Sequence, residues 1–169
     1  MFGLSVAIAT PFDKDDKIEV NEFRNQISNL LTSKIDSITF FGTTGEGPSI
    51  SFSEKIQTLE YLLSYELSPK QIYVSIIQSN YKSAKIEIDK YNELGINKFL
   101  VSPPFFFKEL DQNALEKWFI NLFSNIFQSL YLNLCVIITY INILKMFLKK
   151  IVRFYKNLML IYISIFFRG

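Results

Sequence analysis

Gly42-Thr43-Thr44-Gly45-Glu46-Gly47-Pro48 is the stretch that decides the fold of this 169-residue chain. It follows a β-type run at residues 35–41 and precedes a helix-like segment that opens at Ser51. Its three glycines permit a positive φ and a close approach of the backbone to a ligand, because they carry no Cβ. The paired threonines offer hydroxyl and amide donors beside a helix start, where a carboxylate or phosphate is the natural guest. The stretch is therefore either a ligand site or a purely geometric strand-to-helix turn.

The same succession of a β-type run and a helical run occurs four times in residues 1–126. The predicted strands are residues 4–10, 35–41, 72–77 and 98–101, and the predicted helices are residues 20–31, 53–67, 83–94 and 111–125. Strands that alternate with helices predict an α/β fold with a parallel sheet and right-handed crossovers. Short strands in units of roughly 30 residues favour a partial (β/α)₈ barrel, its first four units, with the active site on the loops that follow the strands.

Composition excludes several classes of protein. Hydrophobic residues make up 49% of the chain and the net charge is +2, so we expect a real core and no nucleic-acid partner. With no histidine and only Cys135, the sequence offers no disulfide, no His-based metal site and no Ser-His or Cys-His nucleophile pair. We therefore expect neither a metal nor a cofactor. No signal-peptide pattern opens the chain, which indicates a cytoplasmic protein.

Three segments at matching spacing resemble a known family. They are Ala7-Ile8-Ala9-Thr10-Pro11-Phe12, Gly42-Thr43-Thr44-Gly45-Glu46, and Gly95-Ile96 leading to Val101-Ser102-Pro103-Pro104. Together they resemble the dihydrodipicolinate synthase / N-acetylneuraminate lyase family over residues 1 to about 126. The resemblance implies a (β/α)₈ barrel, typically homotetrameric, that condenses pyruvate with an aldehyde through a lysine Schiff base. The threonine pair is similar to that of 4-hydroxy-tetrahydrodipicolinate synthases, and N-acetylneuraminate or 2-keto-3-deoxy-sugar-acid lyases are the alternative.

The resemblance also implies roles within the loop. Thr43 matches the catalytic position that relays a proton, and Thr44, Gly42, Gly45 and Thr10 match positions that bind the substrate. Hydroxyl and amide donors suit the carboxylate of a 2-keto acid and would fix its imine for attack.

The chain departs from the family pattern in two places. Pro104-Phe105-Phe106 stands where the synthases tend to place a tyrosine pair, so this segment offers no phenol to relay a proton. No equivalent of the family's Tyr-Asn-x-Pro segment or Schiff-base lysine is recognisable after Ile126. Glu46 can serve as an acid or base, or as a capping partner at a helix entrance.

Residues 127–169 have a different composition. They contain six Lys or Arg and no Asp, Glu or Pro, so this tail carries +6 whereas residues 1–126 carry −4. One hypothesis is translation in a shifted frame, since another frame from codon 127 allows Pro-Lys-Ser-Ile-Pro followed by Tyr-Asn. The chain is then a truncated family enzyme that is inactive alone. Residues 127–144, which are uncharged, suggest instead a membrane-associated, non-enzymatic half-barrel. A soluble half-barrel that only binds the keto acid is the third hypothesis.

Overall fold

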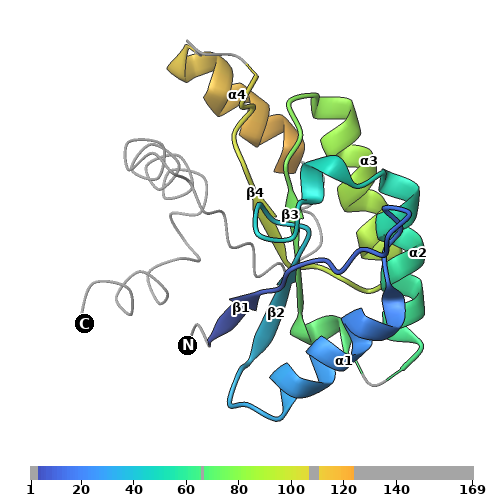
Figure 1. Cartoon of the computed structure of the whole chain (residues 1–169). Coiled ribbons are helices and arrows are strands. Elements are labelled where there is room, and N and C mark those ends of the chain that lie inside the picture. The colour runs from blue at the N-terminus through green and yellow to red at the C-terminus, as the bar shows by residue number, and fades with distance from the viewer. Residues whose placement is uncertain (1–3, 66, 107–110, 124–169) are drawn as a thin grey trace, which may run out of the picture.

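A computed structural model of the chain describes residues 4–65, 67–106 and 111–123 (Figure 1). The predictions made for residues 127–169, namely a separate tail, a shifted frame or a membrane anchor, lie outside these described residues. Within the described ranges, none of the helices has the length and apolar character needed to cross a bilayer.

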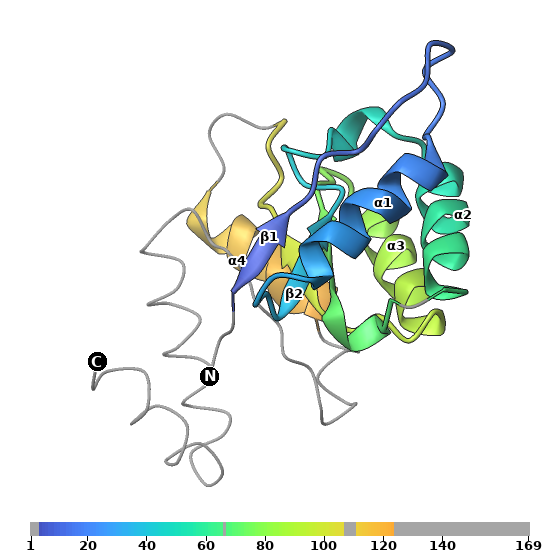
Figure 2. The same ribbon diagram turned by 60° about the horizontal axis from the view of Figure 1, so that its bottom comes forward.

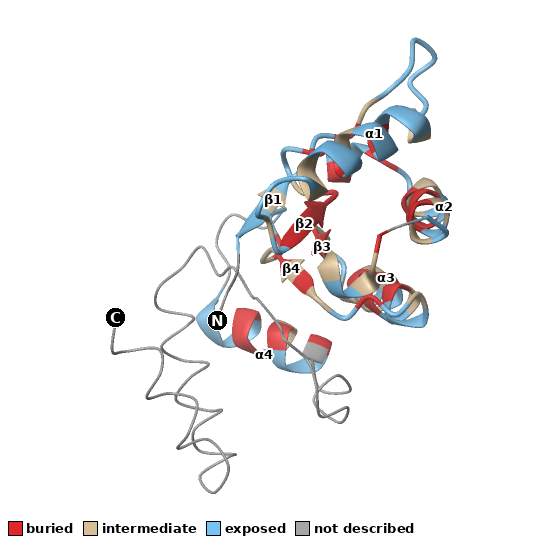
Figure 3. Ribbon diagram, turned by 90° about the horizontal axis from the view of Figure 1, so that it is seen from below, coloured by how far each residue is buried: buried red, intermediate tan, exposed pale blue. Residues whose placement is uncertain are grey.

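Four β/α units follow one another along the chain. The strands are β1 (Ser5–Ala7), β2 (Ser37–Phe40), β3 (Ile72–Ile76) and β4 (Phe99–Val101), which pair in parallel in the order β1-β2-β3-β4. The helices are α1 (Val20–Leu31), α2 (Phe52–Leu63), α3 (Tyr81–Glu93) and α4 (Gln112–Phe123), with 3-10 turns η1 (Gly47–Ser49) and η2 (Pro69–Gln71). Seen along the sheet, the helices surround one of its sides (Figures 2 and 3). The predicted parallel sheet of four units is confirmed.

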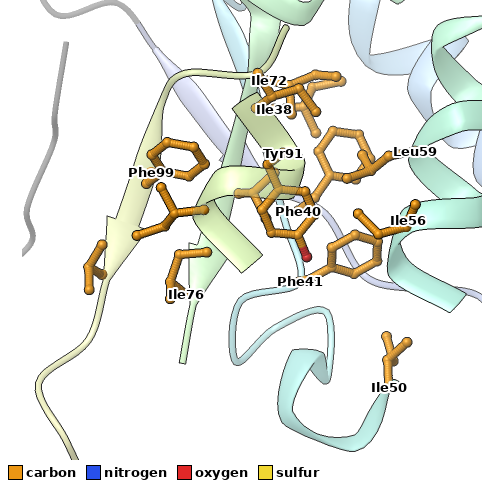
Figure 4. Packing of buried hydrophobic residues seen from close by; sticks show 14 of the residues in the cluster. Ile38, Phe40, Phe41, Ile50, Ile56, Leu59, Ile72, Ile76, Tyr91 and Phe99 are labelled. Atoms are coloured by element: carbon orange, nitrogen blue, oxygen red, sulfur yellow. The ribbon is translucent and has the colours of Figure 1, made fainter. Parts of the chain in front are cut away.

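The hydrophobic core lies between the sheet and these helices. The register sets Ile38 opposite Ile72 and Val74 opposite Phe99, so apolar side chains of successive strands share one face. Aromatic rings fill much of the space behind this face, where Phe40, Tyr91 and Phe99 are fully buried (Figure 4). Burial of side chains of this size contributes about 1.5–3 kcal/mol each, which is why the predicted apolar stripes set the packing.

The other face of the sheet is rich in hydroxyl groups. Ser5 and Thr39 lie on it, and their hydroxyl oxygens are 3.0 Å apart. Ser37 and Ser75 also alternate with the core residues of their strands. In a (β/α)₈ barrel this face points to the interior.

Helix α2 is shorter than predicted and is capped by a different carboxylate. Ser51 Oγ accepts from the Glu54 amide, and Glu54 Oε2 accepts from the Ser51 amide, so these two residues form a capping box. Glu46 makes no capping hydrogen bond with its side chain, so the capping role predicted for it is wrong. The helix ends at Leu63, and Leu67, predicted as its last residue, packs into the core beyond that end.

Candidate active site

The loop that joins β2 to α2 has an uncommon backbone conformation. Phe41 and Glu46 have φ values of +56° and +52°, in the left-handed region that costs a residue other than glycine about 1–3 kcal/mol. The expectation that the loop glycines supply a positive φ is wrong, since in the described part of the chain only Gly95 among glycines has one.

Gly42, Gly45 and Gly47 are required because neighbouring atoms leave too little space for a Cβ at these positions. A Cβ on Gly47 would overlap the carbonyl group of Phe41, and one on Gly45 would lie 2.8 Å from the carbonyl oxygen of Ile8. A Cβ on Gly42 would lie 3.2 Å from the Ser75 hydroxyl oxygen. The absence of a Cβ at these positions thus lets the loop pack against the residue that follows β1 and against Ser75 of β3, and the predicted close approach to a ligand stays a prediction.

Hydrogen bonds hold the loop in this shape. The Gly47 amide donates to the Gly42 carbonyl at 3.0 Å, and the Glu46 amide donates to the Thr43 carbonyl at 3.2 Å. Thr10, which follows β1 and is 8% exposed, donates its hydroxyl proton to the Gly45 carbonyl at 2.7 Å. Thr10 and Gly45, both predicted as site residues, are thus brought together. With its proton committed, Thr10 can offer a ligand only an acceptor.

Thr43 and Thr44 lie at the tip of the turn. Both are exposed, and neither hydroxyl makes a hydrogen bond within the described residues. The turn follows the carboxyl end of β2, on the side of the sheet where parallel α/β folds place their ligands. Two unpaired hydroxyls and adjacent backbone amides on a firmly held loop can receive a small carboxylate.

The loops after β3 and β4 lie at the same end of the sheet. The Phe106 amide donates to the Ser79 hydroxyl at 3.2 Å, which joins these two loops. Phe105 is 63% exposed and Phe106 is 75% exposed. Large exposed phenylalanine rings thus occupy the segment in which, by the resemblance, the synthases tend to place a tyrosine pair.

Two buried ionisable residues were not anticipated from the sequence. Lys55 on α2 is 6% exposed and Glu87 on α3 is 3% exposed. Helical spacing groups Lys55 with Leu59 and Leu62, and this pattern would have revealed it as a core position. Burial lowers the pKa of Lys55 and raises the pKa of Glu87.

A lowered pKa is what an imine-forming lysine needs, but the position of Lys55 is wrong for that role. Its Nζ lies 6.0 Å from the centroid of the Phe41 ring, within the core between the sheet and the helices. Thr43 and Thr44 are exposed at the loop tip beyond Phe41. The described residues also contain no group of three His, Cys, Asp or Glu side chains that could hold a metal ion.

Comparison with known proteins identifies the family. The model of the dihydrodipicolinate synthetase family matches residues 1–131. A 4-hydroxy-tetrahydrodipicolinate synthase from Wigglesworthia glossinidia brevipalpis is 32% identical over 125 residues, covering 66% of this chain and 41% of that protein. A 2-dehydro-3-deoxy-phosphogluconate/2-dehydro-3-deoxy-6-phosphogalactonate aldolase from Sulfurisphaera tokodaii is 32% identical over 127 residues, which cover 74% of this chain and 42% of that protein.

Solved structures agree with the sequence comparisons. The crystal structure of dihydrodipicolinate synthase from Agrobacterium tumefaciens superposes with a TM-score of 0.75 at 29% identity, covering 80% of this chain and 47% of that one. The predicted fold, the first units of a (β/α)₈ barrel, is therefore confirmed. The chain spans less than half the length of these relatives. It belongs to the dihydrodipicolinate synthetase family.

Proposed function

We propose that this chain is related to the pyruvate-dependent lyases of the 4-hydroxy-tetrahydrodipicolinate synthase type but is inactive alone, and that its Gly42–Gly45 segment binds the carboxylate of the 2-keto acid. One observation carries the proposal: Thr43 and Thr44, at the carboxyl end of β2, present hydroxyls that have no hydrogen-bond partner in the described part of the chain, on a turn held by backbone hydrogen bonds. Thr44 and the amide of Gly45 bind the carboxylate, and Thr43 relays a proton. Donors that are fixed in advance stabilise such a charge with little reorganisation.

The chemistry that follows binding requires groups that this sequence does not recognisably supply. Condensation through a Schiff base needs a lysine at the barrel mouth, and the buried Lys55 lies in the core instead. Phe105 and Phe106 have no hydroxyl for a proton relay. We therefore propose that the 169-residue chain binds pyruvate without forming the imine. A frame change near codon 126 would explain this, and sequencing the DNA there tests it.

A related 2-keto acid aldolase is the second candidate. Its support is the similarity to the Sulfurisphaera tokodaii aldolase, which has the same identity, 32%, as the first synthase. Both candidates use pyruvate and differ in the aldehyde, so the pyruvate site is shared. Homotetrameric assembly remains a prediction from the family, and a cytoplasmic location remains a prediction from the sequence.

Borohydride trapping with pyruvate, read by intact mass, tests the claim about the imine. We expect no covalent adduct on this chain under conditions in which the Agrobacterium tumefaciens synthase is labelled. An adduct would overturn the claim. Peptide mapping and a Lys55→Met variant would then show whether Lys55 is the lysine involved.

A further inference from the structure

Helices α2 and α3 bury a pair of opposite charges behind the candidate loop. Lys55 and Glu87 are 6% and 3% exposed, and the two charges influence each other. They are not in direct contact: the ion pairs within 4.0 Å in the described part of the chain are Lys85–Asp89 and Lys90–Glu93, on the surface of α3. Two buried charges are costly to keep, so their retention calls for an explanation.

Each member of the pair reaches a different strand-end loop. The Lys55 ammonium lies 6.0 Å from the centroid of the Phe41 ring, within the range of a cation–π interaction. Phe41 has the positive φ that starts the Gly42–Gly45 turn. On the other side, Glu87 Oε1 accepts a 2.7 Å hydrogen bond from Gln78 Nε2, in the loop that follows β3.

The surroundings of Glu87 make its charge dependent on Lys55. The groups that face it are Lys55 from α2, Gln78 from the loop after β3, and Tyr91 one turn along α3. Its second oxygen, Oε2, is buried with no hydrogen-bond partner among the described residues, and so is the Tyr91 hydroxyl. The carboxylate is thus held by one hydrogen bond and by the field of one buried cation.

We propose that Glu87 is a positioning residue that, through Lys55 and Gln78, fixes the loop after β2 relative to the loop after β3. A charged Glu87 keeps the Lys55 ammonium over Phe41, and the packed Phe41 ring maintains the left-handed backbone that presents Thr43 and Thr44. Without that charge, the Lys55 ammonium loses the counter-charge that Glu87 supplies and moves toward solvent. The turn then opens more often. Only the identity of what the turn binds rests on the proposed function.

Hydrogen exchange of individual amides tests this proposal without a ligand. The Glu46 and Gly47 amides report on the turn, because they donate to Thr43 and Gly42 within it. The Ile8 and Val74 amides, which donate to Thr39 and Lys98, report on the sheet. We expect Glu87→Gln and Lys55→Met to speed exchange at the two turn amides by about tenfold or more relative to the two sheet amides. Asp89→Asn, on the exposed face of the same helix as Glu87, is the matched control. It should leave the exchange rates of the two turn amides and of the two sheet amides unchanged.

A purely structural role for Glu87 would speed exchange at all four amides equally, and that result would overturn the proposal. Unchanged exchange in the turn would overturn it as well. If Glu87→Gln does not fold, Gln78→Met serves in its place, because it removes only the link to the loop after β3. Equal acceleration at all four amides, or unchanged exchange in the turn, would overturn the proposal for this variant too. A pyruvate titration on the same samples separates the two claims. Wild-type chain that does not bind pyruvate contradicts the proposed function, whereas the exchange result stands by itself.

Discussion

The Thr10 hydroxyl donates a 2.7 Å hydrogen bond to the carbonyl oxygen of Gly45, and this bond joins the end of β1 to the loop that follows β2. The two residues are 35 positions apart in the sequence and meet because β1 and β2 are parallel neighbours. The bond places a residue matched to the substrate site in a supporting role for the turn that carries Thr43 and Thr44.

Replacing Thr10 by valine should therefore destabilise the fold. The variant keeps the side-chain volume but leaves the Gly45 carbonyl without its donor, at a cost of about 1–3 kcal/mol in the free energy of unfolding. Urea denaturation measures the change. The control is Thr32→Val, because the Thr32 hydroxyl donates to the Asn29 carbonyl in an exposed position. A loss no larger for Thr10→Val than for the control would contradict the role assigned to this bond.

Alanine substitutions of the glycines should differ in a fixed order. Gly47→Ala should cost most, since its Cβ overlaps backbone, and Gly45→Ala should follow, since its Cβ would lie 2.8 Å from a carbonyl oxygen. Gly42→Ala meets only a hydroxyl, at 3.2 Å, and should cost least of the three. We expect losses above about 2 kcal/mol for the first two. Gly95→Ala, where φ is +79° and the nearest atom is 3.6 Å away, should cost about 1 kcal/mol. Thermal unfolding measures the stability of the four variants. Equal losses of stability would contradict the claim that the space available for a Cβ sets the order.

Tyr91→Phe should leave the fold as stable as the wild type or more stable. Tyr91 is fully buried, and its hydroxyl has no hydrogen-bond partner among the described residues. Burial raises the pKa of this hydroxyl, so it stays neutral and unpaired at ordinary pH. Removal of this hydroxyl should raise the free energy of unfolding, measured by urea denaturation, by up to about 1 kcal/mol. Tyr61→Phe is the comparison, because the Tyr61 hydroxyl donates to Asn21 and its loss should be mildly destabilising. A loss of several kcal/mol in Tyr91→Phe would reveal an important partner for this hydroxyl.

The pH dependence of stability should carry the signature of Glu87. Burial raises the pKa of the Glu87 carboxyl, against smaller opposing effects of Lys55 and of the Gln78 hydrogen bond. The folded chain therefore retains this proton at pH values where the unfolded chain has lost it. The resulting stabilisation is complete below the ordinary glutamate pKa and is lost as the pH rises through the raised value. Glu87→Gln cannot titrate, so its stability relative to the wild type should increase as the pH rises from the ordinary glutamate pKa through the raised value. Urea midpoints of both proteins across this range measure the difference, and a constant difference would contradict the raised pKa.

Regular periodicity made most of the fold predictable. Apolar spacing such as Phe23–Ile27 on α1 and Leu115, Phe119 and Leu122 on α4 identified the buried faces of helices, and these residues are buried. Gly95, which follows the predicted third helix, has a φ of +79°, as a glycine just beyond a helix C-terminus commonly does. Helix ends were less predictable, because Leu67 belongs to the core without belonging to α2.

The details of the site were less accessible from sequence. Composition suggested that the glycines take the positive φ values, but tertiary packing assigns these to Phe41 and Glu46 and uses the glycines for close contact. The electrostatic influence of Lys55 on Glu87 acts between two helices, and no local sequence pattern reports such a pairing. The roles of Thr43 and Thr44 remain predictions, because no ligand contact tests them.

Titration of the ¹⁵N-labelled chain with pyruvate, followed by the amide signals of Gly42 to Gly45, tests the central claim most directly. We predict saturable shifts confined to these amides and their neighbours, with affinity reduced by about tenfold or more in Thr44→Val, which removes one charge-assisted hydrogen bond. Thr32→Val, distant on the surface after α1, should bind as the wild type does. Absence of shifts at Gly42 to Gly45 at saturating pyruvate, or unchanged affinity in Thr44→Val, would contradict the assignment of this turn as the keto-acid site.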